Sequence, residues 1–557
     1  MLQVEARAPS TRISRSFYSN QPLFLLEAPA IESVEAVRKL FFAPTKVVFR
    51  ERKTTFACDK RLKKTCYMKR LTFGEKVGYS MGDVAANLVF QMMMIYQLKF
   101  YTDIFGLSGA VAGTVLVVAP LMAMVADPLA GIAADRTRTR WGKYRPWLLW
   151  TALPFSVFYV LAFTHPDIAD KTLVAVYATV SYVLLLTMYS FNNTPYASLG
   201  GVMTGDMRQR TSITSIRFVA STIAQFVVQG LTLPLVGKFS QGDAARGWHT
   251  TIVLFAAAAF VCSIVAFATT RERIAPPPSQ QMSIRRDVAE TFGSVPWRAL
   301  FVLTLVLYVT LAMWGSGMSF YFQSYVDQQS LYAFLDQLGL VASDGGRRWE
   351  LLEAFNLVAH RQGDAYAIGF SLFNMVNAVV QFLGVILLSG FLANRWGKKS
   401  TFIVCLALTT LFTALFYLPR PTNVAALYVL CLLKSLAYAP TIPIFWAMVA
   451  DVADHIEYVN HRRATGFCFS GMVCALKVGL GIGGALAGGL LSAFGYVSGS
   501  TAAQSASAVT GIRWVASLLP ALLFALGLVC LYFYPITQKF NLHIQQALEA
   551  RRQGKEA

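Results

Sequence analysis

The sequence has 557 residues, of which 55% are hydrophobic and only 14% charged, and its mean hydropathy is +0.49. A soluble globular chain needs far more charge on its surface, and many apolar segments here reach the roughly 20 residues that cross a bilayer. Composition therefore excludes a soluble protein and predicts a polytopic membrane protein. Because the segments lack the strand alternation of an outer-membrane barrel, we expect an all-α bundle.

The first element in chain order is an amino extension, residues 1–67. It is rich in basic residues and has no signal-peptide pattern. We expect this extension to be disordered, or to precede a natural start at Met68.

The apolar segments after the extension predict twelve membrane spans in two halves of six. The first half, 68–270, has spans at 74–102, 109–134, 146–164, 172–198, 212–236 and 250–270. The second half, 299–537, has spans at 299–326, 366–390, 400–418, 423–449, 467–493 and 510–535. Proline interrupts one of them in "YAPTIPIFWAMVA" (438–450), and such breaks are tolerated inside a bundle.

Three polar segments complete the predicted organisation. A linker at 271–298, containing "IAPPPSQQ", joins the halves, and residues 538–557 form a tail. An insertion at 327–365 has helix-like apolar spacing. Two interpretations are open. The insertion forms one or two short helices that cap the outer entrance, or it is only a surface decoration.

Basic residues give the predicted orientation, because they concentrate in one set of loops. The most basic short loop is 135–145. By the positive-inside rule, this loop, the linker and both termini face the cytoplasm.

Two similar stretches mark the corresponding ends of the two halves. "GIAADRTRTRWGK" (131–143) ends the second span, and "GFLANRWGKK" (390–399) ends the eighth. Repeated halves are typical of transporters that work by alternating access around a site between the halves. The repeat therefore favours a transporter over a membrane enzyme.

These stretches carry a family resemblance. The Gly-x-x-x-Asp-Arg pattern at Gly131, Asp135 and Arg136 resembles the signature loop of the major facilitator superfamily. Four longer strings resemble its glycoside–pentoside–hexuronide:cation symporter family, the melibiose permease-like branch: "DPLAGIAADRTRTRWGKYRP", "GYSMGDVAANL", "FYTDIFGLS" and "MVADVADHIEYVNHRRATGFCFS". The resemblance covers roughly residues 70–540. It implies the major facilitator fold, with 12 transmembrane helices in two six-helix halves, and cation-coupled sugar transport rather than catalysis.

Charged residues at the cytoplasmic ends of the spans are candidate gates. The family uses these regions as an inner gate, which the resemblance places on Asp135, Arg136, Arg138, Asp451, Asp454 and Arg463. Arginines at such positions can pair with a carboxylate or with exposed helix carbonyls, and so clamp the halves together. The alternative is solvated charge that only orients the loops.

Charges inside the spans are more informative, since each is costly in hydrocarbon. They are Asp83, Lys99, Asp127, Arg217, Lys434 and Lys477. Asp127 precedes Asp135 by eight residues, roughly 12 Å along a helix, and Lys477 lies at a comparable depth in the other half. The two could pair across the halves and exchange partners when a cation binds, or form a purely structural ion pair.

The resemblance also assigns residues of a cation site. It places Asp127 on a cation-binding carboxylate and Ser190 on a cation-liganding hydroxyl. Asp83, a charge inside the first span, is a further candidate for coupling. Ala123 and Ala126, however, stand where the family has other cation-site residues. A sodium site of that design has lost ligands, whereas one buried carboxylate can still carry a proton. We expect proton coupling, with sodium coupling or no coupling as alternatives, and no metal or cofactor besides the coupling ion.

Side-chain chemistry and the family resemblance together give the candidate substrate-binding residues. Amides suit a polyhydroxyl ligand because each offers donors and an acceptor, and aromatic rings can stack on sugar faces. The candidates are Asn87, Asn192, Asn193, Arg217, Trp446 and Lys477. The resemblance places Asn193 on a sugar-contacting aspartate and Arg217 and Lys477 on polar cavity residues. The basic residues leave a uronate substrate open without requiring one.

The expected function is symport of glycosides, oligosaccharides or pentosides across a cytoplasmic membrane by a monomer in the lipid bilayer. A lysolipid-type carrier and a transport-dead sensor remain alternatives. Nucleic acid is not an expected partner, because the net charge of +20 is spread over loops and tails.

One motif match is discarded. "GLGIGG" (479–484) has the letters of a dinucleotide fingerprint but lies inside a predicted span. There, glycines at 479, 483, 484 and 488 predict close packing against neighbouring helices.

Overall fold

The structure, a computed structural model, describes residues 71–204, 207–273, 284–342, 350–460, 465–498 and 504–552. All of them belong to one compact unit, Met68–Ala557. The amino extension 1–67 and the candidate gate residue Arg463 lie outside the described residues.

The described chain is helical, and the all-α prediction is confirmed. The first half contains α2 (Phe73–Ile95), α3 (Gln97–Lys99), η2 (Phe100–Ile104), α4 (Gly109–Ala123), α5 (Ala126–Arg136), α6 (Arg145–Ala162), α7 (Lys171–Met203), α8 (Met207–Ser240) and α9 (Ala244–Thr269). The second half contains α10 (Ile284–Gly293), α11 (Val295–Ser324), α12 (Gln328–Gln337), α13 (Glu350–Ala354), η3 (Gln362–Asp364), α14 (Ala365–Trp396), α15 (Lys398–Leu415), α16 (Val424–Tyr438), α17 (Thr441–Asn460), α18 (Thr465–Ala493), α19 (Ala506–Arg513), η4 (Trp514–Leu518), α20 (Leu519–Tyr532) and α21 (Gln538–Arg552).

Within the described residues, 10 helical segments are long and apolar enough to cross a membrane. Two predicted spans, 74–102 and 146–164, coincide with α2 and α6 but are not among the 10. Helix α2 carries polar side chains along its length, and α6 has only 18 residues and begins with an arginine. Both nevertheless pack in the same bundle, α2 against α8 and α9, and α6 against α7 and α9.

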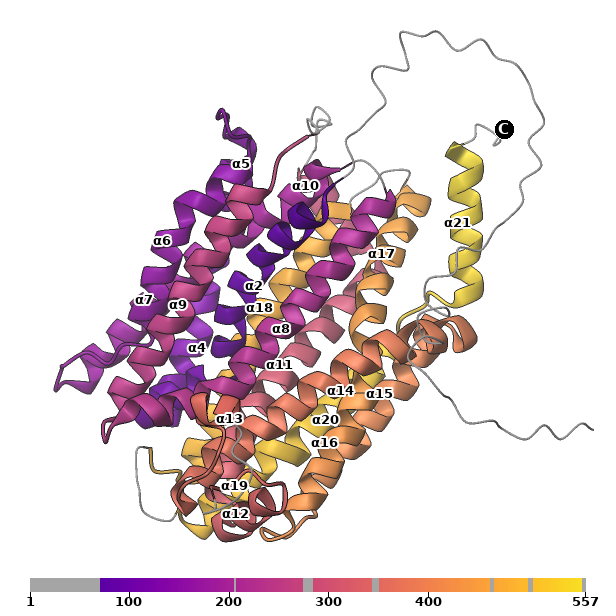
Figure 1. The fold of residues 1–557 in the computed structure, drawn as a ribbon. Coiled ribbons are helices and arrows are strands. Elements are labelled where there is room, and N and C mark those ends of the chain that lie inside the picture. Colours follow the sequence, from indigo (N-terminus) through magenta and orange to yellow (C-terminus); the bar gives the residue numbers. More distant parts are fainter. Residues whose placement is uncertain are drawn as a thin grey trace, which may run out of the picture. The chain divides into compact units, whose positions relative to one another are not determined.

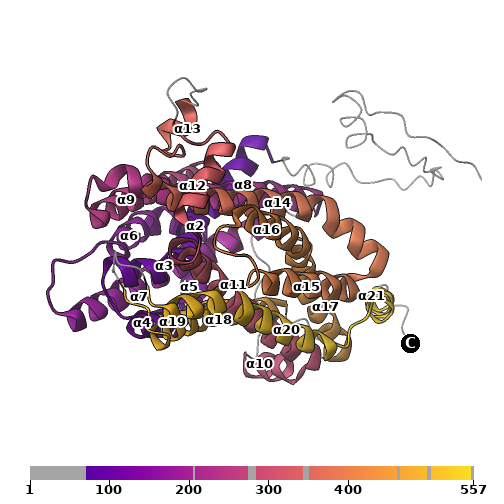
Figure 2. The ribbon, with the colours of Figure 1, turned by 90° about the horizontal axis from the view of Figure 1, so that it is seen from below.

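The helices form two groups that correspond to the predicted halves (Figure 1). Helices α5, α6, α7 and α9 lie on one side and α15, α16, α17 and α20 on the other. Between them, α4 packs along α18, α8 along α14, and α2 contacts α11. Viewed along the bundle, the α4–α18 and α8–α14 contacts lie on opposite edges, with α2 and α11 between them (Figure 2). These six helices therefore form the main contacts between the halves.

Glycines set how closely α18 packs. A Cβ on Gly488 would lie 2.3 Å from the carbonyl oxygen of Gly109 in α4. On the opposite side, a Cβ on Gly483 would lie 2.4 Å from the carbonyl oxygen of Val309 in α11. The close packing predicted for the glycine-rich span is confirmed, because α18 lies between α4 and α11 at backbone contact.

The insertion 327–365 forms the short helices α12 and α13 and the turn η3 at one end of the bundle. Asp327 caps α12 by accepting from the Ser330 backbone N–H at 2.9 Å. The insertion also reaches the first half, since Lys238 donates to the Ala354 carbonyl (2.6 Å) and Asn356 donates to the Pro234 carbonyl (3.0 Å). The expectation of short helices is confirmed, and they join the halves at this α12 end.

Candidate functional site

A cavity of about 230 Å³ lies between the halves. Six helices line it: α2 and α8 from the first half, and α11, α14, α16 and α17 from the second. Its polar lining consists mostly of carboxamides: Gln91, Gln225, Gln229, Asn374, Asn377 and Gln381. Trp314, Tyr308 and Tyr438 add aromatic surface.

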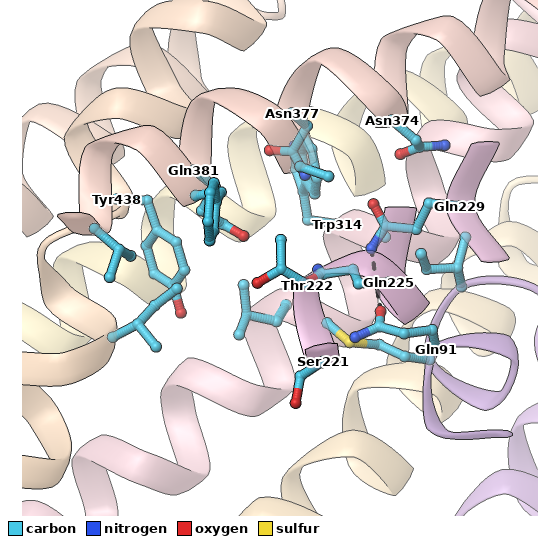
Figure 3. Close-up of a pocket in the computed structure, with 18 of the residues that line it drawn as sticks. Gln91, Ser221, Thr222, Gln225, Gln229, Trp314, Asn374, Asn377, Gln381 and Tyr438 are labelled. Carbon is cyan, nitrogen blue, oxygen red and sulfur yellow. Dashed lines mark hydrogen bonds between the residues drawn. The ribbon is translucent and has the colours of Figure 1, made fainter. Parts of the chain in front are cut away.

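The amides converge from opposite walls (Figure 3). Gln229 donates to the Gln91 side-chain oxygen at 3.1 Å, which joins α8 to α2. Across the cavity, Asn377 accepts from Ser435 at 2.6 Å, so its own amide N–H groups stay available as donors. The side chains of Gln225 and Gln381 also line the space. Such a lining offers donors and acceptors on several sides of a polar ligand.

A second polar group joins the halves through Asp127. Lys477 of α18 is ion-paired with Asp127 of α5 and also donates to Ser190 of α7 at 3.0 Å. The side chains of Lys477 and Asp127 are 15% and 29% exposed, whereas Ser190 is buried. The structure thus brings together two first-half residues expected to handle the cation and one second-half lysine.

A helix break places Asp127. Helix α4 ends at Ala123, and α5 starts at Ala126, so that Asp127 lies in the first turn of α5. Prolines on both sides, Pro120 and Pro128, remove backbone donors around this point. The carboxylate therefore lies in the first turn of a helix that begins inside the predicted span.

Asp83 occupies a separate ion pair in the first half. Its carboxylate lies 3.2 Å from Arg217 Nε and also accepts a hydrogen bond from Ser221. The Arg217 guanidinium lies over the Tyr196 ring, 5.6 Å from its centroid. Since Ser221 lines the cavity, this pair lies just behind the cavity wall rather than in the Asp127 network.

The remaining predicted substrate residues lie away from the cavity lining. Asn87 donates to the Asp83 carbonyl (2.9 Å), and the buried Asn192 donates to Thr151 (2.8 Å). Asn193 is half-buried on α7, and Trp446 stacks on Phe469 with centroids 6.1 Å apart. The Asn192 bond joins α7 to α6, whereas the Asn87 bond stays within α2.

The cavity amides were missed by the sequence reasoning, although they leave a signal. Ser221, Gln225 and Gln229 recur every four residues along α8, and Asn374, Asn377 and Gln381 recur at intervals of three and four along α14. Such spacing puts each set on one helix face. A search for polar stripes within the predicted spans would have singled out both sets of residues, though not that they face each other.

The first-half gate residues lie at the end of the bundle opposite α12, where α5 ends (Figure 1). Asp135 accepts from the Tyr144 hydroxyl at 2.7 Å, while Arg136 and Arg138 are exposed. Burial and the Asp135 carboxylate raise the pKa of Tyr144 far above its usual range, so the hydroxyl remains a donor.

Glu272 holds the same loop, a role that sequence reasoning did not assign. Its carboxylate accepts from the backbone N–H groups of Lys143, Tyr144 and Arg145 at 2.7–2.9 Å. Gly142 has φ +115°, and a Cβ there would lie 2.4 Å from the Glu272 carboxyl carbon. The start of the predicted linker thus fixes the basic loop.

The second-half gate residues form a different arrangement. The Asp451 carboxylate, which is 6% exposed, accepts from Lys398 with both oxygens at 2.7 Å. Asp454 is half-buried on the same helix, α17. The bonds of Asp135 and Asp451 each stay within their own half.

At the α12 end, by contrast, a lysine–aspartate pair joins the halves. Lys99 is bonded to Asp103 (2.7 Å) and to Gln323 of the second half. Tyr496, also of the second half, donates to Asp103 at 3.2 Å. A polar network of Lys99, Asp103, Gln323 and Tyr496 therefore joins the halves at the α12 end.

Comparison with known proteins identifies the family. The chain matches the family model described as MFS/sugar transport protein over residues 78–343 and 355–538. The chain belongs to this family. It is thus a multi-pass membrane transporter of the major facilitator superfamily and not an enzyme.

Relatives of this family span almost the whole described chain. The inner membrane symporter YicJ of Escherichia coli K12 is 30% identical over 488 residues, covering 87% of this chain and 96% of its own. The isoprimeverose transporter of Lactiplantibacillus pentosus is 29% identical, covering 83% and 89%. The fold is similar to that of the solved nucleoside transporter NupG, with a TM-score of 0.52 at 14% identity, covering 83% of this chain and 99% of that one.

Proposed function

We propose that this protein is a cation-coupled symporter for a glycoside or pentoside, with the substrate bound in the amide-lined cavity. The proposal draws on the sugar-transport family, on the symporter and isoprimeverose relatives, and on the chemistry of the lining. Carboxamides can both donate to and accept from sugar hydroxyls, and Trp314 offers an apolar face for a ring.

The observation that carries the coupling is the Lys477–Asp127–Ser190 network between the halves. A proton on Asp127 would remove the charge that attracts Lys477 and so weaken one link between α5 and α18. Sodium would need several oxygen ligands, and here the Lys477 ammonium already occupies the carboxylate and the hydroxyl. We therefore favour the proton as the coupling ion, carried by Asp127, over sodium or uncoupled transport.

The proposed setting is a cytoplasmic membrane with both termini in the cytoplasm, and the protein acting as a monomer. The basic loop 135–145 would then face the cytoplasm, and the α12 end with its Lys99–Asp103 network would face outward. In this arrangement bonds between the halves lie on the outer side, while the Asp135 and Asp451 bonds do not join the halves.

Gradient-driven uptake tests the proposed function. Purified full-length protein in proteoliposomes is given labelled xylosides and glucosides, isoprimeverose among them, under an imposed proton gradient, a sodium gradient or neither. We expect at least one sugar to accumulate with the proton gradient only. Accumulation with the sodium gradient alone would refute the proton assignment, and no flux of any glycoside under any gradient would refute sugar symport.

A further inference from the structure

A second cavity, of about 220 Å³, is separate from the amide-lined one. Its walls come from the end of α14, the start of α15, the middle of α17, the segment between α20 and α21, and α21 itself. Among the described residues, the two cavities share none of their lining. The chemistry of the second cavity comes mainly from Gly397, Lys398, Lys399, Asp451, Tyr534 and Asn541.

The charged side chains of this cavity leave a positive balance. The Lys398 ammonium donates to both oxygens of Asp451 at 2.7 Å, so these two groups neutralise each other. Lys399 makes no ion pair with a carboxylate of the described residues. It donates to the Tyr534 carbonyl at 2.5 Å, which uses one of its three N–H groups. The charge of Lys399 therefore remains for an anion.

The start of α15 adds backbone donors at the same place. This helix of 18 residues begins at Lys398, and no side chain caps its first turn. The first N–H groups of a helix have no intrahelical acceptor and lie at the positive end of the helix dipole, where phosphate groups bind well. Gly397 keeps this end open, because it has φ +80° and a Cβ there would lie 2.8 Å from the Gln538 side-chain oxygen.

Two polar groups of the lining are buried without a partner. Tyr534 is 1% exposed, and its hydroxyl makes no hydrogen bond with a described residue. The side-chain oxygen of Asn541 on α21 is likewise unpaired among the described residues. Since a buried polar group without a partner is costly, both groups point to a ligand. A phosphate oxygen would accept from the tyrosine, and a ligand hydroxyl would donate to the amide oxygen.

The surface beside the cavity is apolar and aromatic. Trp396, next to Gly397 in the chain, is 47% exposed, and Tyr532 and Phe533 at the end of α20 are 79% and 63% exposed. Leu542, which lines the cavity, is 53% exposed. Exposed tryptophan and tyrosine at the ends of spans are typical of the membrane interface, where phospholipid head groups lie.

We propose that this second cavity binds a phosphate ester that carries hydroxyl groups, as in the head group of phosphatidylglycerol or in a soluble glycerol phosphate. The phosphate would lie on Lys399 and the start of α15 and accept from Tyr534, while a hydroxyl would donate to Asn541. The exposed aromatic residues favour the lipid as the source. Because α17 and α21 form opposite parts of the wall, the bound group would hold the tail helix beside the candidate gate residue Asp451.

Thermal unfolding of the purified, delipidated full chain in detergent tests the proposal without requiring transport. The probes are phosphatidylglycerol, phosphatidylcholine with the same acyl chains, and glycerol 3-phosphate. We expect phosphatidylglycerol to raise the unfolding temperature by several degrees more than phosphatidylcholine does. Stabilisation by glycerol 3-phosphate without such a lipid preference would identify a soluble ester as the source and still support the site. No lipid preference and no effect of glycerol 3-phosphate would overturn the proposal.

Substitutions then assign the binding to this cavity. Lys399→Gln removes the unpaired charge and leaves the Lys398–Asp451 pair in place, so we expect the affinity for the stabilising probe to fall about tenfold. Lys539→Gln, on the exposed surface of α21 outside the lining, is the matched control and should not change the affinity. An unchanged affinity in folded Lys399→Gln would overturn the assignment. If that variant does not fold, Tyr534→Phe takes its place, and an affinity equal to that of the unmodified protein would have the same meaning.

Discussion

Asp127 and Lys477 each depend on the other for neutralisation inside the bundle. Lys477→Gln leaves the Asp127 carboxylate without its ion-pair partner. We expect this to cost on the order of 2–3 kcal/mol, less than for a fully buried pair since both side chains are partly exposed. The double variant Asp127→Asn/Lys477→Gln should recover part of that loss. Thermal unfolding of the two single variants and the double variant in detergent measures these losses of stability. If the loss in the double variant equals the sum of the losses in the single variants, the pair is not coupled.

Gln381 reaches the cavity from α14 and should matter for substrate affinity rather than for stability. Gln381→Ala removes one donor and one acceptor, so we expect the apparent KM for the transported sugar to rise about fivefold with unchanged thermal stability. Gln329→Ala, on the exposed surface of α12, is the matched control. A KM equal to that of the unmodified protein would place the sugar elsewhere.

At the residue scale, the sequence predicted charged groups better than neutral ones. Asp127 and Lys477 could be singled out because a charge in an apolar span is conspicuous, and Ser190 because the family resemblance places it on a cation-liganding hydroxyl. The structure brings Lys477 into contact with both. Neutral amides such as Gln225 and Asn377 are less conspicuous, and their meeting depends on which faces of α8 and α14 turn inward. Packing decides that orientation, and a single sequence does not contain it.

Among the elements, α18 depends most on small residues. Gly488→Ala would bring a Cβ to 2.3 Å from the Gly109 carbonyl oxygen, where only backbone movement relieves the clash. We expect a loss of about 1–3 kcal/mol, seen as a lower unfolding temperature. Gly489→Ala, with nothing within 4 Å of the added carbon, should be neutral or slightly stabilising, because alanine favours helix. Equal effects of the two substitutions would contradict the close α4–α18 contact.

Element boundaries were predictable where apolar runs are long, and less so where site residues interrupt them. Helix α2 carries Asp83, Asn87 and Gln91, and these polar residues make it the least obvious span of the first half. The break between α4 and α5 has no clear sequence signal beyond Pro120 and Pro128. The role of Glu272 could not be foreseen, since it depends on the end of α9 meeting a loop more than 120 residues earlier.

For the whole molecule, the cross-half network at the α12 end should control access to the cavity. Asp103→Asn removes the charge shared by Lys99 and Tyr496, so this end should open more often. A cysteine at Thr222, which lines the cavity, should then react several-fold faster with a membrane-impermeant thiol reagent added from the α12 side. Asp167→Asn, in an exposed loop, should leave the rate unchanged. No acceleration with Asp103→Asn would mean that this network is not the gate.

The central claim is that Asp127 carries the coupling ion between the halves, and one comparison tests it most directly. Unmodified protein and Asp127→Asn are reconstituted side by side, and both proton-driven accumulation and sugar exchange without a gradient are measured. An amide at 127 cannot take up or release a proton, so we predict that accumulation is lost while exchange continues. Proton-driven accumulation that persists in Asp127→Asn would contradict the account.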